Sequence, residues 1–407
     1  MFSALQIRNF RVLWLGTLTS FVAFFMAMIV QSVVAFEIAG NNSAVGTVVF
    51  AQGFGMATLG PIGGAFADRW PKRRVVAIGQ VTAVAVFLAL AALVYTETIT
   101  IFLLALGAFL LGVTLAFLGP ARQGLVVDLV PAERRGNAMV INTVANTGSR
   151  VFGPAVAGVL LAWEGSGAVG AYLVMALFYA ISAASLLLLP PSTVRHDARS
   201  RPVYADVMEG FGYVWGHRRL RLLVFFFAVV IFSGFPHVSI LPGLVENVFA
   251  RGAAEVSELF LVSAAGALSA SLWVVRFGDS TRAHFVYASM AALFGASLLG
   301  VAWAPSYGWV LVGMFWVGVG SGGFQSLNAA VIARETEPVF IGRVMSLALL
   351  AFAGFGLMAL PYGVLADAIG ERSTLAVMGS VVTLFTVYFS VQLAREGAIR
   401  VPRGRQS

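Results

Sequence analysis

Twelve long apolar runs dominate this chain and limit what it can fold into. Each is long enough to cross a bilayer as a helix, which takes about 20 apolar residues. The runs are continuous rather than alternating, so they predict helices and not the strands of a membrane barrel. With 59% hydrophobic and 11% charged residues, the chain is predicted to be an all-α membrane protein. The predicted membrane helices are 12–36, 43–67, 74–95, 99–121, 136–162, 168–190, 220–245, 256–277, 283–303, 307–331, 341–366 and 373–394.

The basic residues of the loops fall on one side of the membrane if all twelve runs cross it. They flank the first run, the turns after the second, fourth, eighth and tenth runs, the long interruption after the sixth, and the carboxyl tail. The opposite loops hold only Arg251 and Arg372. Since lysine and arginine favour the cytoplasmic side, this pattern places both termini in the cytoplasm.

The longest interruption predicts a division into two halves. We expect an N-terminal six-helix half at 1–190, a cytoplasmic linker at 191–217, a C-terminal six-helix half at 218–394 and a basic cytoplasmic tail at 395–407. Within the linker, Tyr204–Trp215 is predicted to form a short amphipathic helix on the membrane surface.

The two halves repeat each other. Gly112–Met139 aligns without gaps on Gly318–Met345 at an offset of 206 residues, and Phe66–Asp68 corresponds to Phe277–Asp279 after a five-residue insertion. Two pseudo-symmetric six-helix bundles joined by a linker are typical of transporters in which the halves rock about a central site. A duplicated membrane protein without transport activity is the alternative.

Several classes of chemistry lack the residues that they require. The chain has no cysteine, which excludes disulfides, thiolate metal sites and cysteine nucleophiles. Its four histidines are scattered, and it has neither a phosphate-binding loop nor a visible nucleophile–base set. We therefore expect no cofactor, no metal and no enzymatic activity. The net charge of +8 follows the topology of the loops, so no nucleic acid is expected as a partner.

The turn after the second run has an ordered group of small, acidic and basic residues, Gly64-Ala65-Phe66-Ala67-Asp68-Arg69-Trp70-Pro71-Lys72-Arg73. A basic turn alone is explained by the positive-inside rule. The Gly-x-x-x-Asp-Arg order resembles the signature of the major facilitator superfamily, with Phe66 in place of leucine and Pro71 in place of glycine. This resemblance implies the twelve-helix major facilitator fold and a gating role for Gly64, Asp68, Arg69, Lys72 and Arg73.

The fifth run combines small residues with a proline inside a membrane helix. Gly148, Gly153, Pro154 and Gly158 resemble the glycine-rich motif that this superfamily associates with export. Small residues permit close approach to a second helix, for which we expect the eighth run, and Pro154 can bend the helix. Ordinary small-residue packing explains the glycines equally well.

Two further stretches resemble one branch of the superfamily. Gly119–Gly124 is followed by Asp128–Arg134, and Arg8–Trp14 stands near the start of the chain. Together they resemble the branch that contains the enterobactin exporter and the macrolide efflux proteins, which implies a bacterial inner membrane. The drug-exporter signature Arg-x-x-Gln-Gly is not matched, because Arg122-Gln123-Gly124 has a different spacing.

A few polar side chains are expected inside the membrane, where a charge costs at least about 2.5–3.5 kcal/mol and usually faces a cavity. Arg150 is predicted near the midplane, and Asn142, Asn146 and Arg150 form one polar stripe at four-residue spacing. An internal ion pair or a polar lock between helices is the alternative reading of the stripe, and for a lone histidine the alternative is a packed, satisfied residue. The other candidate cavity residues are Gln31, Arg122, His237, Gln325 and Asn328.

These features predict a secondary active exporter of a small organic solute, driven by protons and acting as a monomer in the lipid bilayer by alternating access. No acidic residue lies clearly at mid-membrane, so an acid near a helix end, Asp68, His237 or the cargo itself would carry the proton. A cavity with Arg150 and no matching acid favours an anionic or hydrogen-bonding solute, such as a siderophore-like or antibiotic-like compound. An importer with the same fold and a non-transporting membrane sensor or partner-binding protein are the alternatives.

Overall fold

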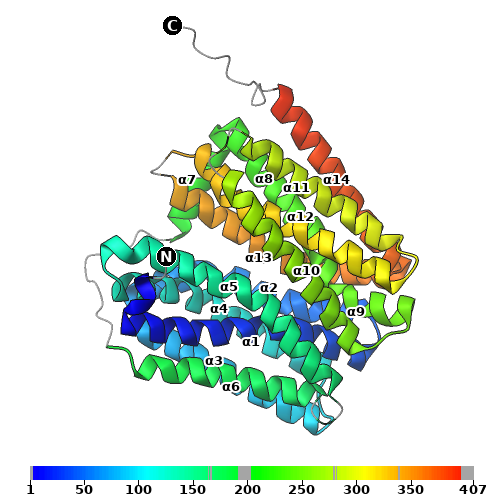
Figure 1. Cartoon of the computed structure of the whole chain (residues 1–407), viewed down its shortest axis with the longest axis horizontal. Helices are drawn as coiled ribbons and strands as arrows, with labels where there is room; N and C mark the ends of the chain where they lie inside the picture. Colours follow the sequence, from blue (N-terminus) through cyan, green and yellow to red (C-terminus); the bar gives the residue numbers. More distant parts are fainter. Residues whose placement is uncertain are drawn as a thin grey trace. The chain divides into compact units, whose positions relative to one another are not determined.

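A computed structural model of the chain consists of helices joined by turns (Figure 1), and its described part contains no β-strand. It describes residues 3–163, 165, 167–190, 203–277, 280, 282–337 and 340–395, and within these ranges the side chains of residues 3, 61–69, 132, 203–207, 275, 342, 346, 349, 352 and 353 lie outside the description. The helices are α1 (Arg8–Ala39), α2 (Asn42–Arg69), α3 (Lys72–Tyr95), α4 (Ile101–Leu129), α5 (Arg135–Ala162), α6 (Gly167–Leu187), α7 (Val203–Gly216), α8 (Arg218–Gly234), α9 (Leu241–Gly243), α10 (Ala253–Val274), α11 (Ala283–Ala302), α12 (Tyr307–Arg334), α13 (Ile341–Ile369) and α14 (Glu371–Arg395).

Each of the twelve predicted membrane segments overlaps one long helix of this set. The short helices α7 and α9 are not counted among those twelve. Ten helices in the described part of the chain are long and apolar enough to cross a membrane. Helix α5 is more polar, because Asn142, Asn146 and Arg150 interrupt its apolar sequence. Helix α13 contributes a shorter apolar stretch at Gly354–Ile369. The prediction of an all-α membrane protein is confirmed.

The segment predicted at 220–245 is the irregular member of the set. Helix α8 ends at Gly234, and a 3₁₀ turn at Phe235–Ser239 and a π-helical turn at Leu244–Val248 flank α9. Pro236 and Pro242 lie in this stretch, and proline removes a backbone donor and disfavours a continuous α-helix.

The linker helix is present as α7, close to the predicted limits of Tyr204–Trp215. The rest of the predicted linker, residues 191–202, lies outside the described residues, as does the predicted tail beyond residue 395. The boundaries of the two predicted halves stay a prediction.

The helices form two compact units, and the first combines the start of the sequence with two later segments. It contains Met1–Ala205, Val238–Leu261 and Gly356–Glu371. Within it α2 packs along α4, α1 packs on α5 and α6, and α3 packs on α4 and α6 (Figure 1). Two segments from late in the sequence therefore belong to a unit built mainly from the first six membrane helices.

The second unit contains Asp206–His237, Val262–Phe355 and Arg372–Ser407. Within it α11 packs along α12, and a cluster of buried aromatic rings fills the core. Phe226 stacks on Phe389 with ring centres 4.1 Å apart, and Tyr287 stacks on Phe324 at 4.4 Å. Aromatic rings supply large apolar surfaces with preferred geometries, so this cluster fixes how α8, α11, α12 and α14 meet.

Close contacts between equivalent helices confirm the internal repeat. A side chain at Gly112 of α4 would overlap the carbonyl oxygen of Gln52 on α2, and a side chain at Gly318 of α12 would overlap that of Ser263 on α10. Gly112 and Gly318 are 206 residues apart, and Gln52 and Ser263 are 211 apart, which is the same offset plus the five-residue insertion. Both units therefore use the same small-residue contact to bring two helices together.

We expect alanine at Gly112 or Gly318 to lower stability, because the added methyl group has no room and overpacking typically costs about 1–3 kcal/mol. Alanine at Gly119 or Gly300 meets no neighbouring atom within 4 Å. Those two control variants should be neutral or stabilised, since glycine is a poor helix former. Thermal unfolding of the purified proteins in detergent measures the difference, and equal melting temperatures for all four variants would contradict the shared packing geometry.

Candidate functional site

Two cations from different helices of the first unit lie over neighbouring phenylalanine rings of α1. The guanidinium carbon of Arg122 on α4 is 5.1 Å from the centre of the Phe21 ring, and that of Arg150 on α5 is 5.4 Å from the centre of Phe25. Because Phe21 and Phe25 are four residues apart, they lie one turn apart on the same face of α1. Such contacts contribute roughly 0.5–2 kcal/mol, more where water is excluded. The structure thus brings two of the predicted cavity residues to one face of α1.

Arg122 is almost fully buried, with 4% of its surface exposed. Its Nη2 donates a hydrogen bond of 2.9 Å to Ser20 Oγ, whereas its Nε has no hydrogen-bond partner. In the described part of the chain no carboxylate forms an ion pair with it. Burying a cation without a counterion is costly, so this position is poised to interact with an acceptor that the described protein does not supply.

Arg150 ends the predicted polar stripe of α5. Asn142, Asn146 and Arg150 are each partly exposed, and their four-residue spacing places them on one face of the helix. The residues that α5 buries include Ala138, Ala145 and Ser149. Among the described residues Arg150 has no ion-pair partner, so nothing seen here supports the alternative of an ion-paired lock.

Gln31 is a buried polar residue of α1, with 3% of its surface exposed. Its Nε2 has no hydrogen-bond partner among the described residues. An unsatisfied buried amide typically costs about 1–3 kcal/mol, which is consistent with a position that water or a solute reaches during the working cycle.

The predicted cavity residues of the second unit divide into packed and accessible positions. His237 is buried, with Nδ1 at 2.8 Å from the carbonyl oxygen of Gly234 and its ring against Phe294. Asn328 is also buried, and its Oδ1 accepts a 3.0 Å hydrogen bond from the hydroxyl of Tyr287. Gln325, about one turn earlier on α12, is partly exposed. The contacts of His237 and Asn328 are those of packed residues, and Gln325 is better placed to meet a solute.

The small residues of α5 face two different helices. A side chain at Gly153 would overlap Phe25 of α1, whereas one at Gly158 would meet Ser257 of α10, which is the predicted eighth membrane helix. Gly148 has no neighbour within 4 Å, and Pro154 lies inside the helix. The glycines therefore bring α5 close to both α1 and α10.

The predicted gating turn is described only in part. Residues 61–69 are helical in backbone, and the side chains of Asp68 and Arg69 lie outside the described residues, as does any contact at Gly64. Lys72 forms an ion pair of 2.8 Å with Asp128 of α4. Arg73 donates a hydrogen bond of 3.4 Å to the carbonyl oxygen of Leu187, at the end of α6. The basic end of the turn is thus tied to α4 and α6 of its own unit.

A carboxylate at the other end of α2 was not identified as a site from the sequence. The two oxygens of Asp367, on α13, accept the backbone N–H groups of Asn42 and Ser43 at 2.7 and 2.9 Å. The side chain of Asn41 accepts the next N–H, that of Ala44, at 2.9 Å. A helix leaves four N–H groups unpaired at its amino end, and three of them are satisfied here. A carboxylate at this position also meets the positive end of the helix dipole.

Glu371 extends this cap to a third part of the first unit. Its Oε1 accepts from the side-chain amides of Asn42 at 3.0 Å and Asn247 at 2.7 Å. Asn247 lies in the π-helical turn after α9. Asp367, Glu371 and the two asparagines line one open cavity of about 530 Å³. We call these four residues and Asn41 the carboxylate cap.

Below the carboxylate cap, α2 and α13 approach each other through glycines. A side chain at Gly46 of α2, or at Gly356 or Gly363 of α13, would overlap the backbone of the opposite helix, and the backbone that Gly356 meets is that of Gly53. Both pairs are seven residues apart, which is two turns of a helix. This glycine seam lets the backbones approach closely without interlocking side chains. Sequence reasoning missed it because the two glycine pairs are about 300 positions apart and neither matches a family signature.

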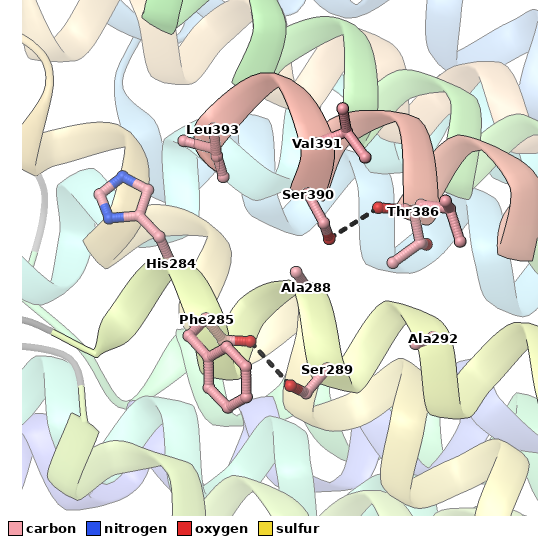
Figure 2. Close-up of a pocket in the computed structure, with 10 residues that line it drawn as sticks. His284, Phe285, Ala288, Ser289, Ala292, Thr386, Ser390, Val391 and Leu393 are labelled. Carbon is pink, nitrogen blue, oxygen red and sulfur yellow. Dashed lines mark hydrogen bonds between the residues drawn. The ribbon is translucent and has the colours of Figure 1, made fainter. Parts of the chain in front are cut away.

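Two further cavities of the described chain have ionisable residues in their walls. Glu37 and Glu246 line a small one beside Arg251. In the second unit, a largely apolar cavity of about 340 Å³ lies between α11 and α14, with His284 near its end (Figure 2). His284 Nε2 is 3.2 Å from Oε1 of Glu335. A hydrogen bond from His284 holds the pKa of Glu335 below its usual range, so Glu335 stays ionised at neutral pH.

Comparisons with known proteins agree with this architecture. The sequence profile described as Major Facilitator Superfamily matches residues 13–356. The Staphyloferrin A transporter of Staphylococcus aureus is 27% identical over 359 residues, covering 86% of this chain and 87% of that protein. Macrolide efflux protein A of Streptococcus pyogenes is 20% identical over 390 residues, covering 93% and 94%.

Solved structures share the fold at low sequence identity. A POT family transporter matches with a TM-score of 0.75 and 14% identity, covering 97% of both chains. The nucleoside transporter NupG matches with a TM-score of 0.74 and 13% identity, covering 95% of this chain and 99% of that one. A bacterial homologue of the human lysosomal transporter Spinster has a TM-score of 0.74 and 14% identity, covering 95% of both chains.

We expect Asp367→Ala to loosen the amino end of α2, because losing a helix cap typically costs about 0.5–2 kcal/mol. Val45, in the first turn of α2, is fully buried, and the chain has no cysteine of its own. A Val45→Cys reporter should therefore react slowly with a maleimide in the otherwise unchanged protein and faster when Asp367→Ala is added.

The matched control is Glu97→Gln, which removes an exposed carboxylate from the turn between α3 and α4 and should leave the labelling rate of Val45→Cys unchanged. Labelling rates that are equal with and without Asp367→Ala would show that the carboxylate cap does not hold this end of α2.

Proposed function

The chain belongs to the Major Facilitator Superfamily, a family of membrane transporters and not of enzymes, and we propose that it exports a small organic solute in exchange for protons by alternating access. As a member it is a multi-pass membrane protein and a secondary transporter with a small-molecule substrate. The proposal concerns the direction of transport, the class of cargo and the coupling ion.

The observation that carries the proposal is the pair of arginines, one from α4 and one from α5, that lie against α1. Arg122 and Arg150 lie over Phe21 and Phe25 without an ion-pair partner in the described chain. A polar, cationic face of this kind favours a cargo that brings its own negative charge or hydrogen-bond acceptors, because charge-assisted hydrogen bonds are about twice as strong as neutral ones. The asparagines of the α5 stripe would add neutral donors and acceptors. A siderophore-like compound fits this chemistry best, and an antibiotic-like compound with several acceptor groups is the next choice.

The names of the relatives support the same class of cargo. One similar protein is a transporter of staphyloferrin A and another is a macrolide efflux protein. Both align over most of this chain. Efflux by one relative and the resemblance of the α5 glycines to an export motif favour export over import.

We place the protein in the inner membrane of a bacterium with both termini in the cytoplasm, acting as a monomer. The distribution of basic residues supports this orientation. The turn at Asp68, Arg69, Lys72 and Arg73 then faces the cytoplasm, where it would serve as the inner gate. The carboxylate cap at Asp367 then faces outward, where it would close the outer side of the cavity.

For proton coupling we propose the carboxylates of the outer cap, Asp367 and Glu371. An ionised carboxylate accepts the backbone donors of α2 and opposes the positive helix end. A protonated carboxyl group loses that charge and part of its acceptor capacity. Proton uptake would therefore weaken the cap, and proton release would restore it, which makes closure of the outer side depend on protonation of these carboxylates.

Replacing Arg150 tests the cargo assignment. We expect Arg150→Gln to weaken cargo affinity by about 10–100-fold, since a hydrogen bond to a charged group contributes roughly 1.5–3 kcal/mol. Arg150→Lys should retain part of the affinity because it keeps the charge. Reconstituted protein is assayed for transport of staphyloferrin A and, separately, of a macrolide. Arg8→Gln removes an exposed arginine at the start of α1 and serves as control, and unchanged affinity in Arg150→Gln would reject the assignment.

Replacing Asp367 tests the coupling assignment. Asp367→Asn keeps the shape of the side chain but cannot bind and release a proton near neutral pH. We expect exchange of labelled for unlabelled solute to continue, while accumulation driven by a pH gradient falls at least about tenfold. Uphill accumulation equal to that of the unchanged protein would exclude Asp367 as the coupling group.

A further inference from the structure

A cavity of about 750 Å³ in the second unit is separate from the proposed cargo site. It lies where α7, α8, α13 and α14 border one another. One wall is the face of α8 that carries Phe225, Ala228 and Phe232, and Leu347 and Leu350 of α13 contribute a second apolar wall. We call this cavity the lateral groove.

Two arginines and a tryptophan stand at one end of the lateral groove. Arg218 and Arg221, in the first turn of α8, line it together with Trp215 of α7. The Nη1 of Arg221 donates to the carbonyl oxygen of Trp215 at 3.0 Å, and its guanidinium carbon is 5.5 Å from the centre of a Trp215 ring. These contacts hold the Arg221 guanidinium at this end of the lateral groove and use only part of its five N–H donors. Among the described residues that line the groove none is acidic.

The length of the lateral groove matches half of a bilayer. From Arg221 to Phe232 the wall extends eleven residues along α8, or about 16 Å at 1.5 Å per residue. The hydrocarbon core of a bilayer is about 30 Å thick, so one leaflet is about 15 Å deep. A ligand with a head group at Trp215 and an apolar tail as deep as one leaflet would fill the groove from end to end.

We propose that the lateral groove binds one anionic phospholipid of the surrounding bilayer. Its phosphate group is held by Arg218 and Arg221, and one acyl chain lies along α8 toward Phe232. Guanidinium groups match phosphate oxygens in charge and geometry. Tryptophan is enriched in membrane proteins at the level of the lipid head groups.

A membrane lipid fits the lateral groove better than a water-soluble anion. The large apolar residues Phe225, Leu350 and Tyr388 line it and are each exposed over 44% or more of their surface. In a membrane protein such an exposed apolar surface is covered by hydrocarbon. A free phosphate compound would use the arginines and leave these walls uncovered, whereas a lipid satisfies both parts of the groove.

Native mass spectrometry of the purified full-length chain tests this site. Phosphatidylglycerol and phosphatidylcholine with identical acyl chains are titrated in separate arms. We expect phosphatidylglycerol to bind more tightly, and the double variant Arg218→Gln, Arg221→Gln to lose about 25-fold in its affinity, or roughly fivefold for each basic group. Inorganic phosphate at millimolar concentration should not displace the bound lipid.

Two further variants distinguish the contribution of the arginines to lipid binding from that of the apolar walls. Ala228→Phe fills the groove while keeping both arginines, and should also lose phosphatidylglycerol. Arg8→Gln with Arg11→Gln removes two exposed arginines from the start of α1, and should bind the lipid as the unchanged protein does. All variants are compared by thermal unfolding to confirm that they fold.

Three results would overturn the proposal. The first is equal binding of phosphatidylglycerol by the Arg218, Arg221 double variant and the unchanged protein. The second is an equal loss of affinity for phosphatidylglycerol and phosphatidylcholine in that double variant, which would mean that the arginines do not recognise the negative charge of the head group. The third is displacement of the lipid by inorganic phosphate, which would assign the arginines to a soluble anion.

Discussion

A helix in lipid satisfies its own backbone except at its ends, and in this protein the amino end of α2 is satisfied by another part of the chain. Asp367 and Asn41 together accept three of the N–H groups that α2 leaves unpaired. The glycine seam below them brings α2 and α13 into backbone contact. These interactions explain why residues 356–371, although late in the sequence, belong to the compact unit formed mainly by α1 to α6. A contact that depends on one ionised carboxylate is also one that a proton can weaken.

The first unit keeps its buried arginines apart from its carboxylates. Arg122 and Arg150 rest on aromatic rings of α1 and have no carboxylate partner in the described chain. The carboxylates of the cap lie near helix ends, where backbone and amide donors satisfy them. Because the cations and the acids are separated in this way, we propose that the arginines bind the cargo and that the carboxylate cap binds the proton. The lateral groove of the second unit adds a basic site that belongs to neither task.

The sequence predicts the helices well, because long apolar runs have few alternatives in a membrane. The offset of 206 residues with its five-residue insertion also relates the equivalent contacts at Gly112 and Gly318. The partners of Asp367 were not predictable, since Asn42 is 325 residues away and a capping carboxylate leaves no local pattern on the helix that it caps. The side chains of Asp68 and Arg69 lie outside the described residues, so their gating role rests on the family resemblance.

The most direct test of the central claim is a distance measured across the carboxylate cap while the pH is changed. Ile38 and Ile369 are both exposed near this end of the first unit, and the chain contains no competing cysteine. Spin labels at these two positions, measured by pulsed electron resonance in lipid nanodiscs, should give one short distance at high pH and a second, longer population as the pH is lowered. In the Asp367→Asn protein the longer population should be present at every pH. A single, unchanged distance at all pH values in both proteins would contradict the account.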